Sequence, residues 1–493
     1  MTVAIWLLGL LRFRSWRAND DIAVLQLGLE RMADGDIPLV GAYSRFGFFH
    51  PGPLREWVIG ISYHASGGRA AAIPATALII NLGLVGLALI AAHRYAARRG
   101  VVAASGALVL TQIGMGAALH SAWNPHLAVL AGAALGWGVV ALIGDGPRNW
   151  WLVVVPGSVL GQLHVAGLAL FTVALVTLVA VLLKAGDVRR LLQAAAATVA
   201  LWIGPLLDLA KGGDSNLSAF FDRETGTAQG ADALGALVRL ITPWSLAAGD
   251  VTSASVPGAS WIETLIIVGA IAAATSVLIR HRHTPVVIVA GVALVVTAVL
   301  GAMLVEPVFA YLWAPLVGVT TLVTGALLLA AVDLIGDRWS PPPATAVLLG
   351  AAVVGAAIAA SLVGWWSLRP IETASLQRTI EATIPRVVGD GEEVRIRTGG
   401  NVLSLAHAEV ALAAQQAGAQ PTSNSFELSL PAPRAGTVTL VTAMTDVLDC
   451  LEQRLHPLAL VMRHPSQATG LDVGVFRVEA TDTAILDDCG VAP

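Results

Sequence analysis

Charged side chains are scarce in this sequence of 493 residues, and their scarcity excludes most classes of soluble protein. Only 13% of the residues are Asp, Glu, Lys or Arg, whereas a soluble domain typically has about a quarter. Hydrophobic residues make up 56% of the chain, and the mean hydropathy is +0.74. This balance predicts a polytopic membrane protein that is mainly α-helical.

The net charge is small as well, and cysteines are few. The formal net charge is −4, and the sequence has no basic stripe of the kind that binds nucleic acid, so no nucleic-acid partner is expected. The two cysteines, Cys450 and Cys489, both follow the last apolar run. In an oxidising compartment they could form a disulfide, and a pair of buried free thiols is the alternative.

Long apolar runs, in contrast, recur along the first three quarters of the sequence. A helix needs about 20 apolar residues to cross roughly 30 Å of hydrocarbon, and by this rule we expect about eleven spans. They lie near residues 1–11, 71–92, 101–119, 127–143, 150–163, 166–183, 191–209, 261–279, 286–304, 311–332 and 344–366. The first run is short, so its helix either lets the arginines that follow snorkel or begins upstream of residue 1.

Basic residues between these runs predict the orientation, because Lys and Arg accumulate in cytoplasmic loops. If the spans alternate, three basic clusters fall on one side, at residues 93–99, 184–190 and 280–283. The loops at 19–70 and 210–258 would then face outward from the plasma membrane. The transmembrane domain would comprise residues 1–367.

The last part of the chain, residues 368–493, has a different composition. It is richer in charge, and residues 392–397 alternate in the manner of a strand. A helical pattern follows at 403–416, and further strand-like runs lie at 426–430, 438–441 and 473–480. We expect a small extracytoplasmic α/β domain.

Acids, bases and cations gather in the first outward loop, residues 19–70. Asp20 and Asp21 stand at its start, and Asp21 opens an amphipathic stretch that should form a helix on the membrane surface. Capping this helix would use one polar side chain and leave a carboxylate available. Gly and Pro residues break the helical pattern at 47–53, and a second short helix is expected at 54–64.

Histidines in separate segments fall on the same predicted face. His50, His120, His126 and His164 all lie in outward loops or at helix ends. Each alone is consistent with a helix cap or a place among the lipid headgroups. Four of them near an acid pair favour a functional site.

The order of motifs in this half of the chain resembles a known family. Ser44-Arg45-Phe46-Gly47 precedes His50-Pro51-Gly52-Pro53-Leu54, and Ala122-Trp123-Asn124-Pro125 and Gln162-Leu163-His164 follow. With the acid at the end of a short first span, this pattern resembles the GT-C superfamily of integral-membrane glycosyltransferases, and it looks most like the actinobacterial members. The resemblance covers residues 1–260.

This resemblance implies a function and roles for particular residues. A GT-C enzyme of this kind would move a sugar from a polyprenyl-phosphate donor to a glycan, lipid or protein acceptor of the cell envelope. Asp21 would be the catalytic base, with Asp20 as the other candidate, because the family has one acid where this sequence has two. The substrate-binding residues would be Arg45, His50, Arg55, Trp123, Asn124, Gln162 and His164.

The residue types also suit this chemistry. A carboxylate can take the proton of an acceptor hydroxyl, and arginine can bind a departing phosphate, although anchoring of Arg45 and Arg55 to anionic headgroups is the alternative. A divalent metal ion, Mg or Mn, could lie between acid and phosphate, but no spacing demands one. The alternative function is a transporter or flippase for an envelope precursor, which would place its polar residues near mid-span.

Overall fold

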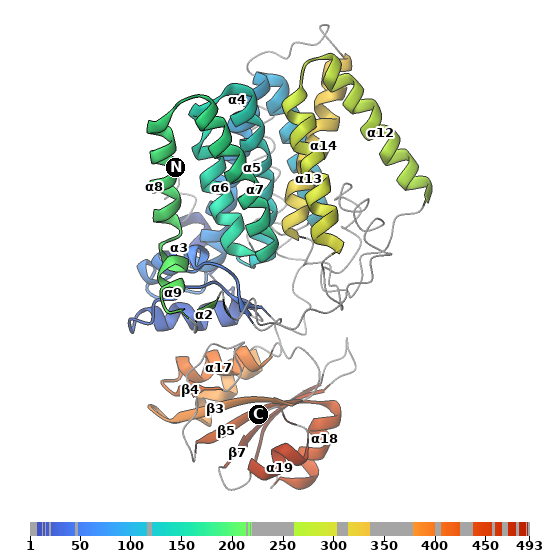
Figure 1. Cartoon of the computed structure of the whole chain (residues 1–493). Coiled ribbons are helices and arrows are strands. Elements are labelled where there is room, and N and C mark those ends of the chain that lie inside the picture. Colours follow the sequence, from blue (N-terminus) through green and yellow to red (C-terminus); the bar gives the residue numbers. More distant parts are fainter. Residues whose placement is uncertain are drawn as a thin grey trace.

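The computed structural model shows a helical bundle, a layer of short helices at one end of it, and an α/β domain beyond that layer (Figure 1). The structure describes residues 7–11, 13–14, 16–18, 21–44, 48–115, 121–212, 215–216, 218, 261–302, 314–335, 378–399, 406–423, 437–455, 459–465, 472–479, 483–489 and 491. Two predicted site residues, Asp20 and Arg45, lie outside these ranges, as do His120 and nearly all of the 210–258 loop.

Helix α5 (Asn124–Asp145) forms the centre of the bundle, where it is buried along most of its length. It packs against α4 (Ala72–Met115), α6 (Trp151–Leu163), α7 (Val165–Lys184) and α14 (Ala314–Ile335). Small residues allow this close packing: a Cβ atom on Gly138 would meet the Leu152 carbonyl oxygen at 2.0 Å, and one on Gly318 would meet that of Val129 at 2.0 Å.

The remaining helices of the bundle lie at its flanks. Helix α8 (Val188–Leu201) and helix α9 (Ile203–Leu209) follow α7 and meet at an angle of 67°. Helices α12 (Trp261–Arg280) and α13 (Thr284–Ala302) pack against α14. A 3-10 turn, η2 (Pro147–Asn149), joins α5 to α6.

The expected number of spans is not confirmed. Within the described residues, four helices are long and apolar enough to cross a membrane, and the bent α8–α9 pair could supply a fifth. Helix α4 combines the runs predicted at 71–92 and 101–119 in one element of 44 residues, with non-helical backbone at Ala96 and Ala97. A straight helix of that length would measure roughly 66 Å, about twice the hydrocarbon core, so the kink divides an element too long for one span. The run at 344–366 lies outside the described residues.

The loops with basic clusters meet at the end of the bundle remote from the α/β domain. The hydroxyl group of Tyr95 lies 3.0 Å from Nδ1 of His283. Arg99 and His283 lie 3.0 Å and 3.1 Å from the buried carboxylate of Asp333, near the end of α14. The connection from α7 to α8 lies at this same end (Figure 1). The basic clusters therefore share one end, as expected, and its assignment to the cytoplasm stays a prediction.

The C-terminal domain contains a five-stranded sheet with the order β4-β3-β5-β7-β6. Its strands are β3 (Glu393–Gly399), β4 (Gln420–Thr422), β5 (Val438–Met444), β6 (Leu460–Pro465) and β7 (Asp472–Val478), of which the first three are parallel. Helix α17 (Ala406–Gln416) covers one face, and α18 (Thr445–Arg454) and α19 (Thr483–Asp488) cover the other. A short turn, η8 (Ile384–Arg386), packs against α17.

The disulfide and much of the predicted strand pattern are confirmed in this domain. Cys450 and Cys489 are bonded, with 5.8 Å between their Cα atoms, and they join α18 to the chain just after α19. Strands β3, β5 and β7 match the predicted runs, whereas β4 and β6 were not expected from the sequence. The run at 426–430 lies outside the described residues.

The layer between the two domains contains α2 (Asp21–Met32), α3 (Leu54–Ala65) and a small hairpin of β1 (Tyr43–Ser44) and β2 (Phe48–Phe49). Both helices match their predicted ranges. Helix α2, however, does not lie on a lipid surface, because Leu25 and Leu29 pack into the bundle while Ala23 and Leu27 pack into the C-terminal domain. Apolar residues on two faces of α2 explain the difference.

Candidate active site

Five segments meet at the end of the bundle nearest the C-terminal domain. They are the start of α2, the turn before α3, the start of α3, the start of α5 and the junction of α6 with α7. Each carries at least one residue that the sequence singled out, although these segments are up to about 140 residues apart along the chain.

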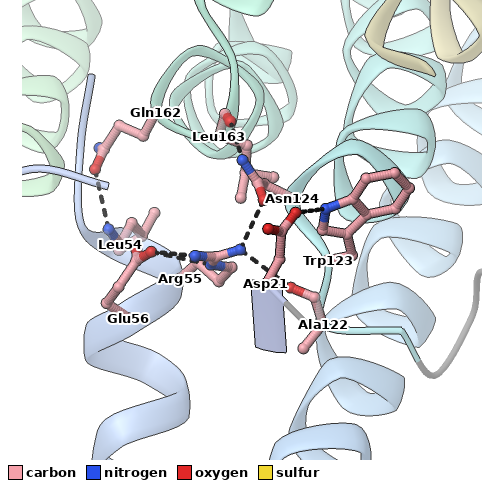
Figure 2. A network of polar contacts seen from close by, with 9 residues as sticks. All are labelled: Asp21, Leu54, Arg55, Glu56, Ala122, Trp123, Asn124, Gln162 and Leu163. Carbon is pink, nitrogen blue, oxygen red and sulfur yellow. Dashed lines mark hydrogen bonds and ion pairs between the residues drawn. The ribbon is translucent and has the colours of Figure 1, made fainter. Parts of the chain in front are cut away.

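Asp21 is held by a tryptophan from a distant segment. The indole Nε1 of Trp123 donates a hydrogen bond of 2.6 Å to Oδ2 of Asp21, across 102 residues of sequence (Figure 2). Trp123 has extended backbone just before α5, and Pro125 fixes the first turn of that helix. Asp21 is exposed at the first position of α2. The structure therefore presents an accessible, oriented carboxylate at the start of α2.

Arg55 is the centre of a buried polar network beside Asp21 (Figure 2). Its Nη1 donates to Oδ1 of Asn124 at 3.0 Å and to the carbonyl oxygen of Ala122 at 3.3 Å. Its Nε and Nη2 both donate to Oε1 of Glu56, at 3.0 Å for Nε. The amide of Asn124 in turn lies 3.4 Å from the carbonyl oxygen of Leu163.

These contacts define what Arg55 does in the fold. Its side chain is 4% exposed, and the adjacent Glu56 carboxylate, 11% exposed, balances its charge. A buried charge that loses its partner is costly, so Glu56 keeps Arg55 in place. The hydrogen bonds of Arg55 to Ala122 and Asn124 then tie α3 to the start of α5. The contacts favour a positioning role for Arg55, and its role as a direct phosphate ligand stays a prediction.

Gln162 fixes the Pro-rich turn against the bundle. Its Oε1 accepts the backbone N–H of Leu54 at 3.2 Å, and its backbone carbonyl accepts that of Gly52 at 3.3 Å. Its Nε2 donates to the carbonyl oxygen of Leu201 at 2.7 Å. A Cβ atom on Gly52 would approach Oε1 of Gln162 to 2.2 Å, so only glycine fits this close contact. Gln162 thereby links the turn to α6 and α8.

His50, just before the Pro-rich turn, and His164, between α6 and α7, form a buried pair. Their ring centroids are 5.0 Å apart, and the rings are inclined by 31°. His164 lies between α6 and α7, outside both helices, and its Nδ1 accepts the N–H of Ala166 as the cap of α7. Burial, His164 and the Arg55 cation hold the pKa of His50 well below its usual range, and burial lowers the pKa of His164 to about 4.

The charge state of this pair changes what it can do. Both imidazoles are neutral at neutral pH, so His50 would meet a substrate as a hydrogen-bonding group rather than as a cation. Among the described residues, Nδ1 of His50 is buried without a hydrogen-bond partner. These surroundings favour a neutral His50 over a cationic one.

Asn216 supports the hairpin that leads into His50. Its Oδ1 accepts the backbone N–H of Phe49 at 2.7 Å, and its Nδ2 donates to the carbonyl oxygen of Phe49 at 2.7 Å. Its own N–H donates to Oδ2 of Asp208 at 2.8 Å, and Lys211 lies 3.2 Å from Oδ1 of that carboxylate. An amide side chain thus pairs with β2 as a neighbouring strand would.

Sequence reasoning assigned no role to two partners in the site. Glu56 carries the charge that balances Arg55, and an adjacent Arg and Glu in a short, mostly apolar helix were the available signal. Asn216 was not given a role, although an Asn that follows Asp208 and a Gly-rich turn is a common backbone-binding side chain. His126, in contrast, packs edge-on against the Trp123 ring, with 5.0 Å between centroids, inside α5.

Metal binding finds limited support in the part of the chain that the structure describes. In those residues, no three side chains among His, Cys, Asp and Glu lie close enough together to hold an ion.

Comparison of the sequence with models of protein families and with curated proteins gave no match. Comparison with solved structures found a likeness to the crystal structure of ArnT from Cupriavidus metallidurans in the apo state. The TM-score is 0.58, the sequence identity is 14%, and the match covers 96% of each chain. At this identity the likeness shows a shared fold: the whole chain, bundle and C-terminal domain together, has an ArnT-like architecture.

Proposed function

We propose that the chain is a membrane glycosyltransferase of the GT-C type, which transfers a sugar from a polyprenyl-phosphate donor to an envelope glycan, lipid or protein. The observation that carries the proposal is the placement of Asp21. Asp21, the preferred of the two candidate acids, lies exposed at the junction of the two domains of an ArnT-like fold, oriented by Trp123. Buried supports around an exposed carboxylate suit a site that must admit two substrates.

The proposed reaction is a single displacement at the anomeric carbon of the donor sugar. The acceptor hydroxyl oxygen forms the new bond to this carbon, the bond from the carbon to the phosphate oxygen breaks, and polyprenyl phosphate leaves with the electron pair. The proton of the hydroxyl goes to the carboxylate of Asp21, with Asp20 as the other candidate base. In this proposal Arg45 binds the donor phosphate, and the neutral imidazole of His50 forms a hydrogen bond with the substrate.

The neighbouring residues would keep this geometry fixed. Trp123 orients the base, while Asn124 and Gln162 tie the turn and α3 to the bundle. His164 caps α7 and packs against His50. Positioning of reacting groups can account for a large part of an enzyme's rate, so these residues can matter without touching the reacting atoms.

The function is tested with the purified chain in lipid nanodiscs. A panel of synthetic polyprenyl-phosphate sugars is offered with envelope lipids and glycans, and the release of free polyprenyl phosphate is measured. We expect release that depends on the acceptor. The alternative hypothesis, a transporter or flippase, predicts instead that a labelled precursor crosses the bilayer of a vesicle while its sugar stays attached.

We further propose that the site and the C-terminal domain face outward from the plasma membrane. Single cysteines at the exposed position 210 and in the C-terminal domain should react with an impermeant maleimide in intact cells, whereas one at position 96 should not. Protection of the first two together with labelling of position 96 would reverse the orientation.

A further inference from the structure

The C-terminal domain packs directly on the helix that begins with Asp21. One face of α2, with Leu25 and Leu29, lies in the core of the bundle. The other face, with Ala23 and Leu27, lies in the core that α17 shares with the sheet of the C-terminal domain. Both Ala23 and Leu27 are 0% exposed, so the domain supplies one of the two cores into which α2 packs (Figure 1).

Polar contacts from three elements converge on one carboxylate near the end of α2. Oε1 of Glu30 accepts hydrogen bonds from Tyr63 of α3 at 3.0 Å and from Gln416 of α17 at 3.2 Å. Gln26 of α2 donates to the same oxygen at 3.2 Å and to the Tyr63 hydroxyl at 3.1 Å. Burial and the Glu30 carboxylate raise the pKa of Tyr63, so its phenol remains a donor at neutral pH.

Two further contacts fix the ends of this layer. A ring nitrogen of His64 lies 2.8 Å from the carbonyl oxygen of Leu29, which ties α3 to the backbone of α2. Arg17, just before α2, pairs at 3.2 Å with Glu381 of the C-terminal domain. A displacement of the C-terminal domain would therefore shift the whole of α2, including its first residue, Asp21.

From these contacts we propose that the C-terminal domain is a working part of the active site: its helix α17 seats α2 and thereby positions Asp21. Glu30 and Gln416 are positioning residues in this scheme, because they act on the reaction only through α2. The inference rests on the proposed function for its catalytic consequence. The seating of α2 itself can be measured without any substrate.

The test uses a charge exchange at the contact between Glu30 and Gln416. Gln416→Glu places two carboxylates against each other and should unseat α2, whereas the double variant Gln416→Glu with Glu30→Gln restores an amide–carboxylate pair. Leu27→Asp is a second disruption, by a charge in the buried face. Glu452→Gln, which breaks the 2.9 Å pair with Arg463 elsewhere in the same domain, is the matched control.

Three quantities are measured in the full-length protein: kcat, donor Kd, and hydrogen exchange of the α2 amides. Gln416→Glu should lower kcat by about tenfold, which is less than the roughly 100-fold that a displacement of about 1 Å can cost, while donor Kd stays unchanged. Exchange in α2 should rise, the double variant should restore both, and Glu452→Gln should change neither.

Unchanged kcat and unchanged α2 exchange in both Gln416→Glu and Leu27→Asp would overturn the inference. A loss of kcat that the double variant does not restore would overturn it as well, since general destabilisation would then explain the loss. A wild-type chain that transfers no sugar would instead refute the proposed function, and α2 exchange would still decide whether the domain seats the helix.

Discussion

The carboxylate of Asp21 and the indole N–H of Trp123 form a 2.6 Å hydrogen bond between residues that are 102 positions apart. Asp21 is the first residue of α2, which packs against both domains, and Trp123 directly precedes α5, the central helix of the bundle. The bond therefore joins the proposed base to the buried central helix of the bundle.

Replacing Trp123 by Phe keeps the ring and removes the donor. A hydrogen bond to a charged group contributes about 1.5–3 kcal/mol, so we expect kcat to fall by about 10- to 100-fold with little change in donor Kd. Trp57→Phe removes a comparable indole bond, 2.9 Å long, to the carbonyl oxygen of Pro38 and serves as the control. An equal loss of kcat in both variants would contradict a specific role for the hydrogen bond between Trp123 and Asp21.

Local patterns in the sequence predicted the elements of the site but not their contacts. The helical spacing after Asp21 and the Pro-rich break before Leu54 correctly located α2 and α3. The helical spacing of apolar residues could not by itself show that α2 has two buried faces, because Ala23 and Leu27 are common residues in any apolar helix. The pairs that build the site, such as Phe49 with Asn216, join segments up to 167 residues apart, and a single sequence contains no signal for such pairs.

In the C-terminal domain, too, the sequence predicted only some of the strands. Strands β3, β5 and β7 carry alternating or β-branched residues and were recognised. Strand β6 contains Arg463, His464 and Pro465 at the edge of the sheet, a composition that propensity does not assign to a strand. Pairing with β7 overrides that local preference.

The neutral histidine pair predicts acid sensitivity. The pKa of His164 is about 4 in the folded protein and near 6.5 in an unfolded chain, so between these values the unfolded state binds more protons. Stability should therefore fall as the pH drops from 6.5 to about 4, by on the order of 3 kcal/mol from this residue. His164→Gln should flatten the dependence of Tm on pH in detergent, whereas His93→Gln, at an exposed position, should leave it unchanged.

Arg45 is the predicted ligand of the donor phosphate. Arg45→Ala should weaken donor binding by about tenfold or more, because a charge-assisted hydrogen bond to phosphate is lost. Arg148→Ala, at the opposite end of the bundle, controls for the general loss of a positive charge. If Arg45→Ala binds a polyprenyl-phosphate sugar as tightly as wild type at moderate salt, another cation, Arg55 or Arg69, holds the phosphate.

The disulfide between Cys450 and Cys489 closes a separation of 39 residues. Replacing both cysteines by Ser should destabilise the C-terminal domain by about 2–4 kcal/mol through the greater freedom of the unfolded chain. The free energy of unfolding is followed by denaturant titration of that domain's signal in the full-length protein. Mass spectrometry of unreduced peptides checks the bond directly, and two free thiols would contradict it.

The central claim is that Asp21 is the general base, and Asp21→Asn tests it most directly. Asn caps a helix about as well as Asp, so the variant should fold and bind the donor as wild type does. Loss of a positioned base typically costs about 10²- to 10⁴-fold in rate, so sugar transfer should nearly vanish at unchanged donor Kd. Full transfer activity in Asp21→Asn would contradict the account, and activity lost only in Asp20→Asn would move the role to the preceding residue.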